Sequence, residues 1–183
     1  DPGRMSAGSK RWTVSFWFRA DDLEDQSLIT IVEKPDTNRN GIQFDIADGK
    51  LRLRHVCRWN HSVIEFESRE PIAADRWYHV AMTSDSRMQG VAYRAYLNGS
   101  PAPMQLTKPT TNDSAGGGAN APLVIGDGPY HRAFRGDMTD VRFYERDLSA
   151  DDVAALALPA AVSQIGAKDD AKRTAAERHL LRQ

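Results

Sequence analysis

The chain has 183 residues, which suits one domain with a short appendage. Hydrophobic residues make up 40% and charged residues 27%, and no apolar run approaches the ~20 residues that a membrane-spanning helix needs, so we expect a folded domain without membrane insertion. Lysine and arginine number 24 against 25 aspartate and glutamate residues, which argues against nucleic acid as a partner. The single cysteine, Cys57, excludes an intrachain disulfide framework and any CxxC metal site.

Short alternating runs between Trp12 and Tyr144 predict an all-β domain. They are rich in Val, Ile, Thr and aromatic residues and are separated by Gly, Asn, Asp and Pro. In the runs 12–18, 42–46 and 79–82, apolar residues alternate with others, so each run offers one face to a core. About ten such strands without interleaved helices indicate two packed antiparallel sheets, a sandwich of the jelly-roll kind.

Turn residues punctuate these runs. Asn40-Gly41, Asp48-Gly49 and Asn98-Gly99 tolerate positive φ, and the last two predict hairpins that pair the strands on either side. The polar stretch from Thr107 to Pro122 is too long for a tight hairpin and predicts a mobile surface loop.

After the last predicted strand the composition changes to that of short helices. Ser149 and the acidic residues that follow it predict the start of a helix that Pro159 ends. A capping box predicts a second helix from Thr174. We therefore expect a jelly-roll domain over 1–158 and a helical linker toward a following domain over 159–183.

Several segments occur in an order that carries a resemblance to a known family. They are WTVSFWF at 12–18, RWYHVA at 76–81, YLNG at 96–99, LVIG at 123–126 and FRGDMTDVRFY at 134–144. Together they resemble the laminin-G-like, concanavalin A-like jelly-roll domain. The segment with His55 and residues 59–60, and the tail 171–178, resemble the version embedded in large bacterial multidomain proteins that also carry c-type cytochrome and unknown-function domains.

The resemblance implies a glycan-binding or adhesive module outside the cytoplasm, whether periplasmic, on the cell surface or secreted. It also implies flanking domains of the same chain as partners and, in many members, a structural calcium ion. Many domains of this fold serve only as spacers or docking surfaces. The alternative is therefore a structural or protein-docking domain with no glycan site.

Catalysis needs side chains that this pattern does not supply. Glu65 and Glu67 alternate on one strand face, but the Glu-x-Asp-x-(x)-Glu pattern of β-glucan-cleaving relatives is absent, and a solvated strand face explains both residues. The histidines show no HExxH spacing, and no serine lies in a GxSxG turn. We expect a non-catalytic domain, within a parent protein whose own activity the sequence leaves open.

Two places offer oxygen ligands to calcium. Asp36, Asn38 and Asn40 stand at every second position, as in the first half of a calcium loop, although Ala47 occupies the position of the bidentate glutamate. An Asx-rich turn without metal is the alternative. Asp140 is the second candidate, because relatives hold an ion at the corresponding strand end; it could instead cap backbone amides.

Sugar binding needs aromatic faces and planar polar groups. In a regular strand Arg54 and Arg58, with Arg52, fall on one face, and arginine forks suit an acidic or sulfated poly- or oligosaccharide. Cross-strand ion pairs with Glu65 and Glu67 are the alternative use of these arginines.

Two further groups complete the predicted sugar site. Trp59, followed closely by His61, ends a strand and either stacks on a sugar or closes the core. Tyr130, His131 and Arg132 share a Gly-Pro loop and are candidates for ligand contact, the alternative being a tyrosine that packs back on the sheet.

Overall fold

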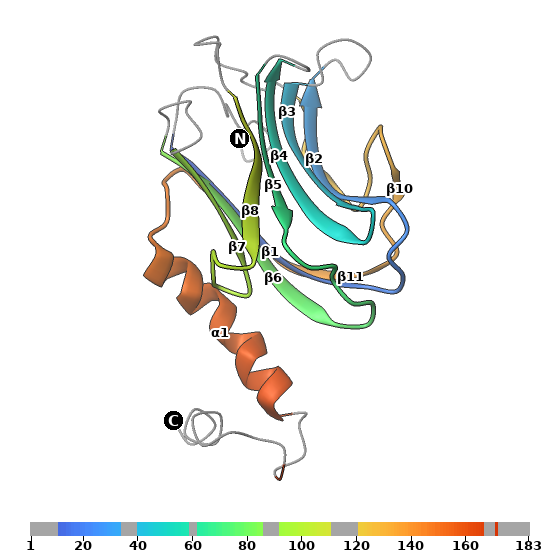
Figure 1. The fold of residues 1–183 in the computed structure, drawn as a ribbon, viewed down its shortest axis with the longest axis vertical. Coiled ribbons are helices and arrows are strands. Elements are labelled where there is room, and N and C mark those ends of the chain that lie inside the picture. The colour runs from blue at the N-terminus through green and yellow to red at the C-terminus, as the bar shows by residue number, and fades with distance from the viewer. Residues whose placement is uncertain are drawn as a thin grey trace.

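The described residues form a sandwich of two β-sheets with a helix against the smaller sheet (Figure 1). The computed structural model describes residues 11–33, 40–58, 62–85, 92–110, 121–166 and 171, without the side chains of 33, 57, 58, 110 and 159–166. The elements are β1 (Trp12–Ala20), β2 (Gln26–Glu33), β3 (Asn40–Ala47), β4 (Lys50–Arg58), β5 (Ser62–Ser68), β6 (Trp77–Ser84), β7 (Tyr93–Leu97), β8 (Met104–Thr110), β9 (Val124–Ile125), β10 (Arg132–Ala133), β11 (Gly136–Tyr144) and α1 (Ala150–Gly166).

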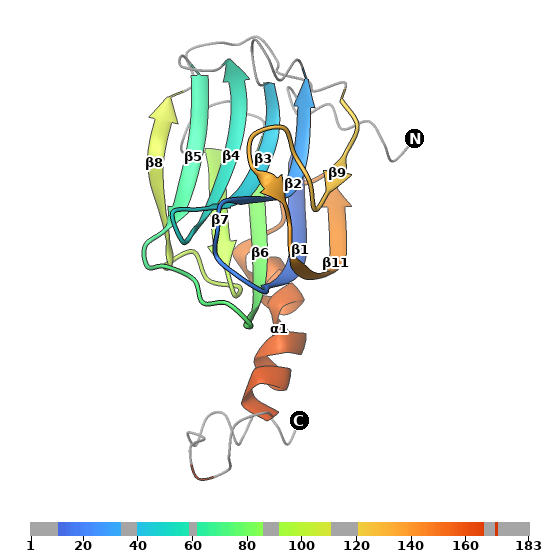
Figure 2. The same ribbon diagram turned by 90° about the vertical axis from the view of Figure 1, so that its right-hand side faces the viewer.

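The sheets are almost entirely antiparallel, and this confirms the predicted jelly-roll sandwich. The four-stranded sheet has the order β11-β1-β6-β7, and the seven-stranded sheet has the order β10-β2-β3-β4-β5-β8 with β9 also paired to β2. Figure 2 looks onto the seven-stranded sheet, with the four-stranded sheet behind it. The two-residue strand β10 is an exception, because it runs parallel to β2.

The core lies between the sheets and is built by the alternation seen in the sequence. Phe16 and Phe18 of β1 are fully buried, as is Phe44 of β3. Phe16 stacks on Phe44 across the core, with ring centroids 5.9 Å apart. Burying each such side chain contributes about 1.5–3 kcal/mol, so the alternating runs supply the main stabilisation of the sandwich.

Both predicted tight turns form, but only one makes a hairpin. Asp48 and Gly49 have φ of 54° and 71° and connect the paired strands β3 and β4. Asn98 and Gly99, at 53° and 78°, also turn the chain, but β7 and β8 belong to different sheets, so the prediction that the flanking strands pair was wrong. A Cβ at Gly99 would lie 2.9 Å from that of Ala157, so the turn is shaped by contact with α1.

The predicted loop from Thr107 begins too early. Thr107 to Thr110 continue β8, which pairs with β5 at the edge of the seven-stranded sheet. An edge strand tolerates a proline such as Pro109, because only one side of the strand pairs with a neighbour and the N–H groups on the other side have no strand to bond. Residues 111–120 of the predicted loop lie outside the described residues.

Helix α1 begins where the sequence predicts. Ser149 Oγ accepts a hydrogen bond from Asp152 N at 3.1 Å, and Asp152 Oδ2 accepts one from Ser149 N at 3.1 Å. Hydrogen bonding of the Asp152 carboxylate to the backbone N–H and the side chain of Ser149 lowers the pKa of Asp152. Val153 then packs in a small apolar cluster with Tyr96, which anchors the helix on the four-stranded sheet.

The helix continues through Pro159 to Gly166, so the prediction that Pro159 ends it was wrong. Proline deprives the carbonyl of Ala155 of its helical donor. Leu158 is 49% exposed, so this part of the helix faces water that can bond the freed carbonyl. The second predicted helix, from Thr174, lies outside the described residues. In the described part of the chain, no helix is long and apolar enough to cross a membrane.

A buried histidine lies on the outer face of the four-stranded sheet. His79 is 1% exposed, and its Nε2 lies 2.8 Å from Ser15 Oγ. The ring of Trp17 covers it, with centroids 4.9 Å apart. Burial, together with the charge of Arg142 and against the attraction of Asp140, lowers the pKa of His79 to about 4.

This histidine makes stability fall at acidic pH. The unfolded chain takes up a proton on His79 near pH 6.5, whereas the folded chain does so only near pH 4, so its contribution is complete above pH 6.5 and is lost as the pH falls between these values. Urea unfolding from pH 7 to 4 should show wild type losing about 3 kcal/mol more than His79→Gln. Parallel pH profiles for the two proteins would contradict the assignment.

Candidate functional site

Alternate residues of the seven-stranded sheet point away from the core and form a polar lattice, here named the polar face. One cross-strand row contains Ser27, Asp45, Arg52 and Glu67, and the next contains Thr30, Gln43, Arg54, Glu65 and Lys108. Figure 1 shows β3 and β4 curving toward β10, which lies beyond the β2 side of this face. Cations and carboxylates alternate along the rows, so the polar face is charged locally and nearly neutral as a whole.

Arg54 lies at the centre of the polar face and is 5% exposed. Its Nε is 2.8 Å from Glu65 Oε2, its Nη2 is 3.8 Å from Asp45 Oδ2, and its Nη1 donates to Gln43 Oε1 at 3.4 Å. Arg52 Nε likewise donates to Glu67 Oε1 at 2.8 Å. The cross-strand pairing that the sequence left as an alternative is therefore observed for both arginines.

The charges of the polar face are tuned by burial and by their partners. Burial alone would raise the pKa of Glu65, but a hydrogen bond from Thr107 and the charges of Arg54 and Lys108 outweigh it and lower that pKa. A glycosidase acid needs a raised pKa instead. Burial raises the pKa of Asp45, against the charges of Arg54 and His131 and the hydrogen bond from Ser27.

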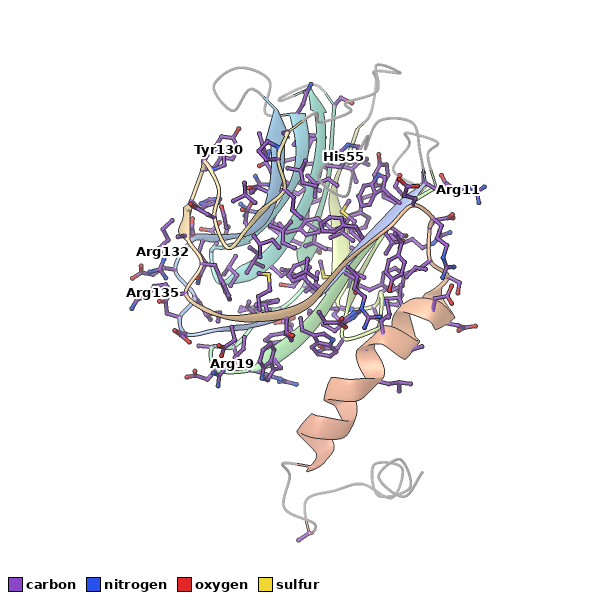
Figure 3. All side chains as sticks on the ribbon, turned by 180° about the vertical axis from the view of Figure 1, so that it is seen from behind. Arg11, Arg19, His55, Tyr130, Arg132 and Arg135 are labelled. Carbon is purple, nitrogen blue, oxygen red and sulfur yellow. The ribbon has the colours of Figure 1, made fainter. Side chains whose placement is uncertain are left out.

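Residues 126–131, between β9 and β10, form the Tyr130 loop. Its backbone lies directly on β2: Thr30 Oγ1 donates to the carbonyl of Asp127 at 2.9 Å, and a Cβ at Gly128 would approach Ser27 Oγ to 2.7 Å. Figure 3 shows Tyr130 near the top of this loop, with Arg132 and Arg135 below it. Tyr130 is half-buried, so part of this aromatic residue is exposed beside the polar face.

The residues that follow Tyr130 lie close to carboxylates of the β1–β2 connection and of β3. Arg132 pairs with Asp22 and, at 3.0 Å, with Glu24. His131 Nδ1 lies 3.8 Å from Asp25 Oδ2, and its Nε2 lies 4.0 Å from Asp45 Oδ2. The loop and the polar face therefore meet at Asp45.

Asp45 is the functional candidate that the sequence reading missed. It brings together two predicted residues, Arg54 and His131, which lie 3.8 and 4.0 Å from its Oδ2. This oxygen is buried and has no hydrogen-bond donor among the described residues. An unsatisfied buried acceptor is costly and marks a place where a ligand hydroxyl or water can donate. The alternation of Ile42, Phe44 and Ile46 already placed Asp45 on the outward face and was the signal available.

The other predicted sugar-binding residues are not placed. Trp59 and His61 lie outside the described residues, as does the side chain of Arg58. Binding of glycan by these residues stays a prediction, as it does for Arg54, Tyr130, His131 and Arg132.

The two calcium candidates lie in different sheets. Asp36 and Asn38 are outside the described residues. Asn40 opens β3, and its buried Oδ1 has no hydrogen-bond partner in the part of the chain that the structure describes. Asp140 has φ of 54° in a bulge of β11, and its Oδ1 accepts from Arg142 Nε at 2.5 Å. Among the residues described, no group of three or more His, Cys, Asp or Glu side chains is arranged so that it could hold a metal ion. Asn40 thus keeps an oxygen suited to calcium, Asp140 is engaged by Arg142, and calcium stays a prediction.

Comparisons with known proteins bear on the fold and the family. A heptameric SAP-like pentraxin from Limulus polyphemus is 18% identical, with a TM-score of 0.56 and coverage of 84% of this chain and 72% of that one. Domain 4 of AbnA, a GH43 extracellular arabinanase from Geobacillus stearothermophilus in complex with arabinotriose, is 22% identical, with a TM-score of 0.58 and coverage of 82% and 68%. The binding domain of Paraclostridial Mosquitocidal Protein 1 is 18% identical, with a TM-score of 0.60 and coverage of 83% and 38%.

At these identities the likeness to solved structures shows the fold alone, and the curated proteins contain no match to the chain. The sequence profile of the concanavalin A-like lectin/glucanases superfamily, in its laminin G form, matches residues 2–154. The described strands form the two-sheet sandwich that this match implies. The chain therefore belongs to the concanavalin A-like lectin/glucanases superfamily.

Proposed function

We propose that this chain is a non-catalytic carbohydrate-binding domain of an extracytoplasmic protein. The observation that carries the proposal is the buried Asp45 Oδ2, which has no hydrogen-bond donor among the described residues and lies on the face beside the half-buried Tyr130. Sugars present hydroxyl donors and an apolar ring face, so these two groups suit one ligand. The likeness to a domain of an extracellular arabinanase that was solved with arabinotriose supports both the ligand class and the location.

The glycan would lie over the polar face from the β2 side. The sugar ring stacks on Tyr130, and one hydroxyl donates to Asp45 Oδ2 once His131 moves aside. The polar contacts of His131 with the described residues are 3.8 and 4.0 Å long, beyond hydrogen-bond distance, so none of these hydrogen bonds has to break when it moves.

The arginines of the polar face are poorly placed to recognise an acidic glycan. An acidic or sulfated glycan requires arginine forks that are not already engaged. On the polar face Arg52 and Arg54 are paired with Glu67 and Glu65, and Arg132 of β10 is paired with Asp22. We therefore propose that the polar face binds sugar hydroxyls and that preference for an acidic glycan comes from cations elsewhere on the domain.

The proposal predicts that Tyr130→Ala weakens glycan binding by about tenfold or more, because a stacked ring contributes much of the affinity of such sites. Affinity electrophoresis in gels containing arabinan, galactan, polygalacturonate or a sulfated galactan measures this directly. Asp45→Asn should also weaken retardation in the gel, since a neutral amide oxygen is the poorer acceptor.

The matched control is Tyr144→Ala, which removes the same side chain from β11 in the other sheet. It should leave retardation unchanged. Equal losses for Tyr130→Ala and Tyr144→Ala would assign the effect to stability, which melting curves of both variants would reveal. If none of the polysaccharides retards the wild-type chain, the carbohydrate-binding proposal fails and the protein-docking alternative is favoured.

A further inference from the structure

A pocket of about 320 Å³ opens where the chain crosses from β5 to β6. This crossing runs between the two sheets at the lower end of the sandwich in Figure 2. The apolar part of its lining comes from Ile72, Tyr78 and Leu97, which are buried. The polar part comes from Arg69, Glu70 and Arg76, which are exposed. A pocket of this volume, at the lower end of the range for small ligands, has room for about one sugar residue.

Its two arginines are held in place. Arg69 donates its backbone N–H to the carbonyl of Pro103 at 2.7 Å and its Nε to the carbonyl of Ala102 at 3.0 Å. This anchors the guanidinium while leaving its terminal nitrogens for another acceptor. The guanidinium carbon of Arg76 lies 5.5 Å from the ring centroid of Tyr78, a cation–π contact that orients it.

Neither arginine has an ion-pair partner among the described residues, unlike most arginines whose side chains are described. Arg19, Arg52 and Arg54, for example, each lie within 4 Å of a carboxylate. Two oriented cations that line one concave surface, and that have no ion-pair partner among the described residues, can together receive an anion. The planar guanidinium matches the two oxygens of a carboxylate.

We propose that this pocket binds a hexuronic acid residue of an acidic polysaccharide, an inference that rests on the proposed carbohydrate-binding function. The carboxylate of the sugar bonds Arg69 and Arg76, and its ring lies against the apolar lining at Ile72. Glu70 accepts hydrogen bonds from the ring hydroxyls. Glu70 also disfavours ligands of high charge density, such as phosphate, because its negative charge opposes a second negative group at the rim.

Isothermal titration calorimetry of the full chain with trigalacturonate tests the proposal, with galactotriose as the neutral probe of the same ring. Wild type should bind trigalacturonate, and binding should weaken as salt rises from about 0.05 to 0.5 M because these exposed charges are screened. The double variant Arg69→Gln/Arg76→Gln should lose about tenfold or more in affinity, since two charge-assisted contacts disappear. Arg76→Lys should retain part of the binding, as it keeps the charge and loses the fork.

Arg94→Gln is the matched control, because Arg94 is an exposed arginine of β7 that does not line the pocket. It should bind trigalacturonate as wild type does. The inference is overturned if the double variant binds like wild type, if galactotriose binds the wild type as tightly as trigalacturonate, or if peptides with a free C-terminal carboxylate bind and trigalacturonate does not. Loss of neutral glycan binding in Tyr130→Ala with trigalacturonate binding intact would separate the two sites, so either proposal can fail alone.

Discussion

Replacing Arg54 with methionine is expected to lower the free energy of unfolding by about 3–5 kcal/mol, the range for removing one partner of a buried ion pair. Arg54 is 5% exposed, and its guanidinium lies between Glu65 and Asp45. Methionine fills a similar volume but leaves both carboxylates buried with less compensation. Urea denaturation at pH 7 measures the loss.

The neighbouring arginine provides the control. Arg52 pairs with Glu67 and with the largely exposed Asp48, and its side chain is 19% exposed. Arg52→Met should therefore cost no more than about 2 kcal/mol, because water can replace part of what is lost. Adding Glu65→Gln to Arg54→Met should recover part of the stability, because it removes a buried charge whose remaining ion-pair partner, Lys108, is half exposed. An Arg54→Met protein as stable as wild type would contradict the view that the lattice on the polar face is held by this residue.

Substituting Gly41 with alanine is expected to cost about 4 kcal/mol or more and to prevent normal folding of β3. Gly41 has φ of +131°, which L-residues rarely adopt, and an added Cβ would lie 1.6 Å from the carbonyl oxygen of Ile31 on the neighbouring strand. Neither backbone can move away without breaking the β2–β3 pairing. Thermal unfolding followed by circular dichroism provides the measurement.

Gly49 is the matched position, since it also has positive φ, +71°, but an added Cβ there would meet nothing within 4 Å. Gly49→Ala should therefore cost about 1–2 kcal/mol, which is the cost of holding a non-glycine residue at positive φ. Equal losses at the two positions would show that the close approach at Gly41 is relieved elsewhere in the sheet.

Much of the fold could be predicted because apolar and polar residues alternate along a strand that has one face against the core. Phe16, Phe44 and Val80 were expected to face a core, and all three are fully buried. The Asp48-Gly49 turn was also predictable from local sequence, since few residue types adopt the positive φ angles that it needs. The turn at Asn98 formed as well, but the partner of β7 depended on the crossover between sheets, which no local signal encodes.

The candidate site was predictable only in part. The stripe containing Arg54 was visible in the sequence, as was the possibility that Glu65 neutralises it. Whether Arg54 is left for a ligand or pairs with Glu65 depends on the strand register, which places Arg54 opposite Glu65 and Gln43. Asp45 is a candidate because the tertiary structure places the Tyr130 loop, which is remote in sequence, on β2 and brings His131 close to Asp45.

The near-zero net charge of the chain shows what the sequence determines and what the tertiary structure determines. From the sequence by itself follow an all-β sandwich, its core positions and the absence of a strong overall field, because alternation and composition are local or summed properties. The tertiary structure decided which charges are cancelled: register pairs those of the polar face, whereas Arg69 and Arg76, on the crossing between the sheets, have no ion-pair partner in the described part of the chain. Coulombic pairing depends on distances of a few ångströms, and folding sets those distances between residues that are remote in sequence.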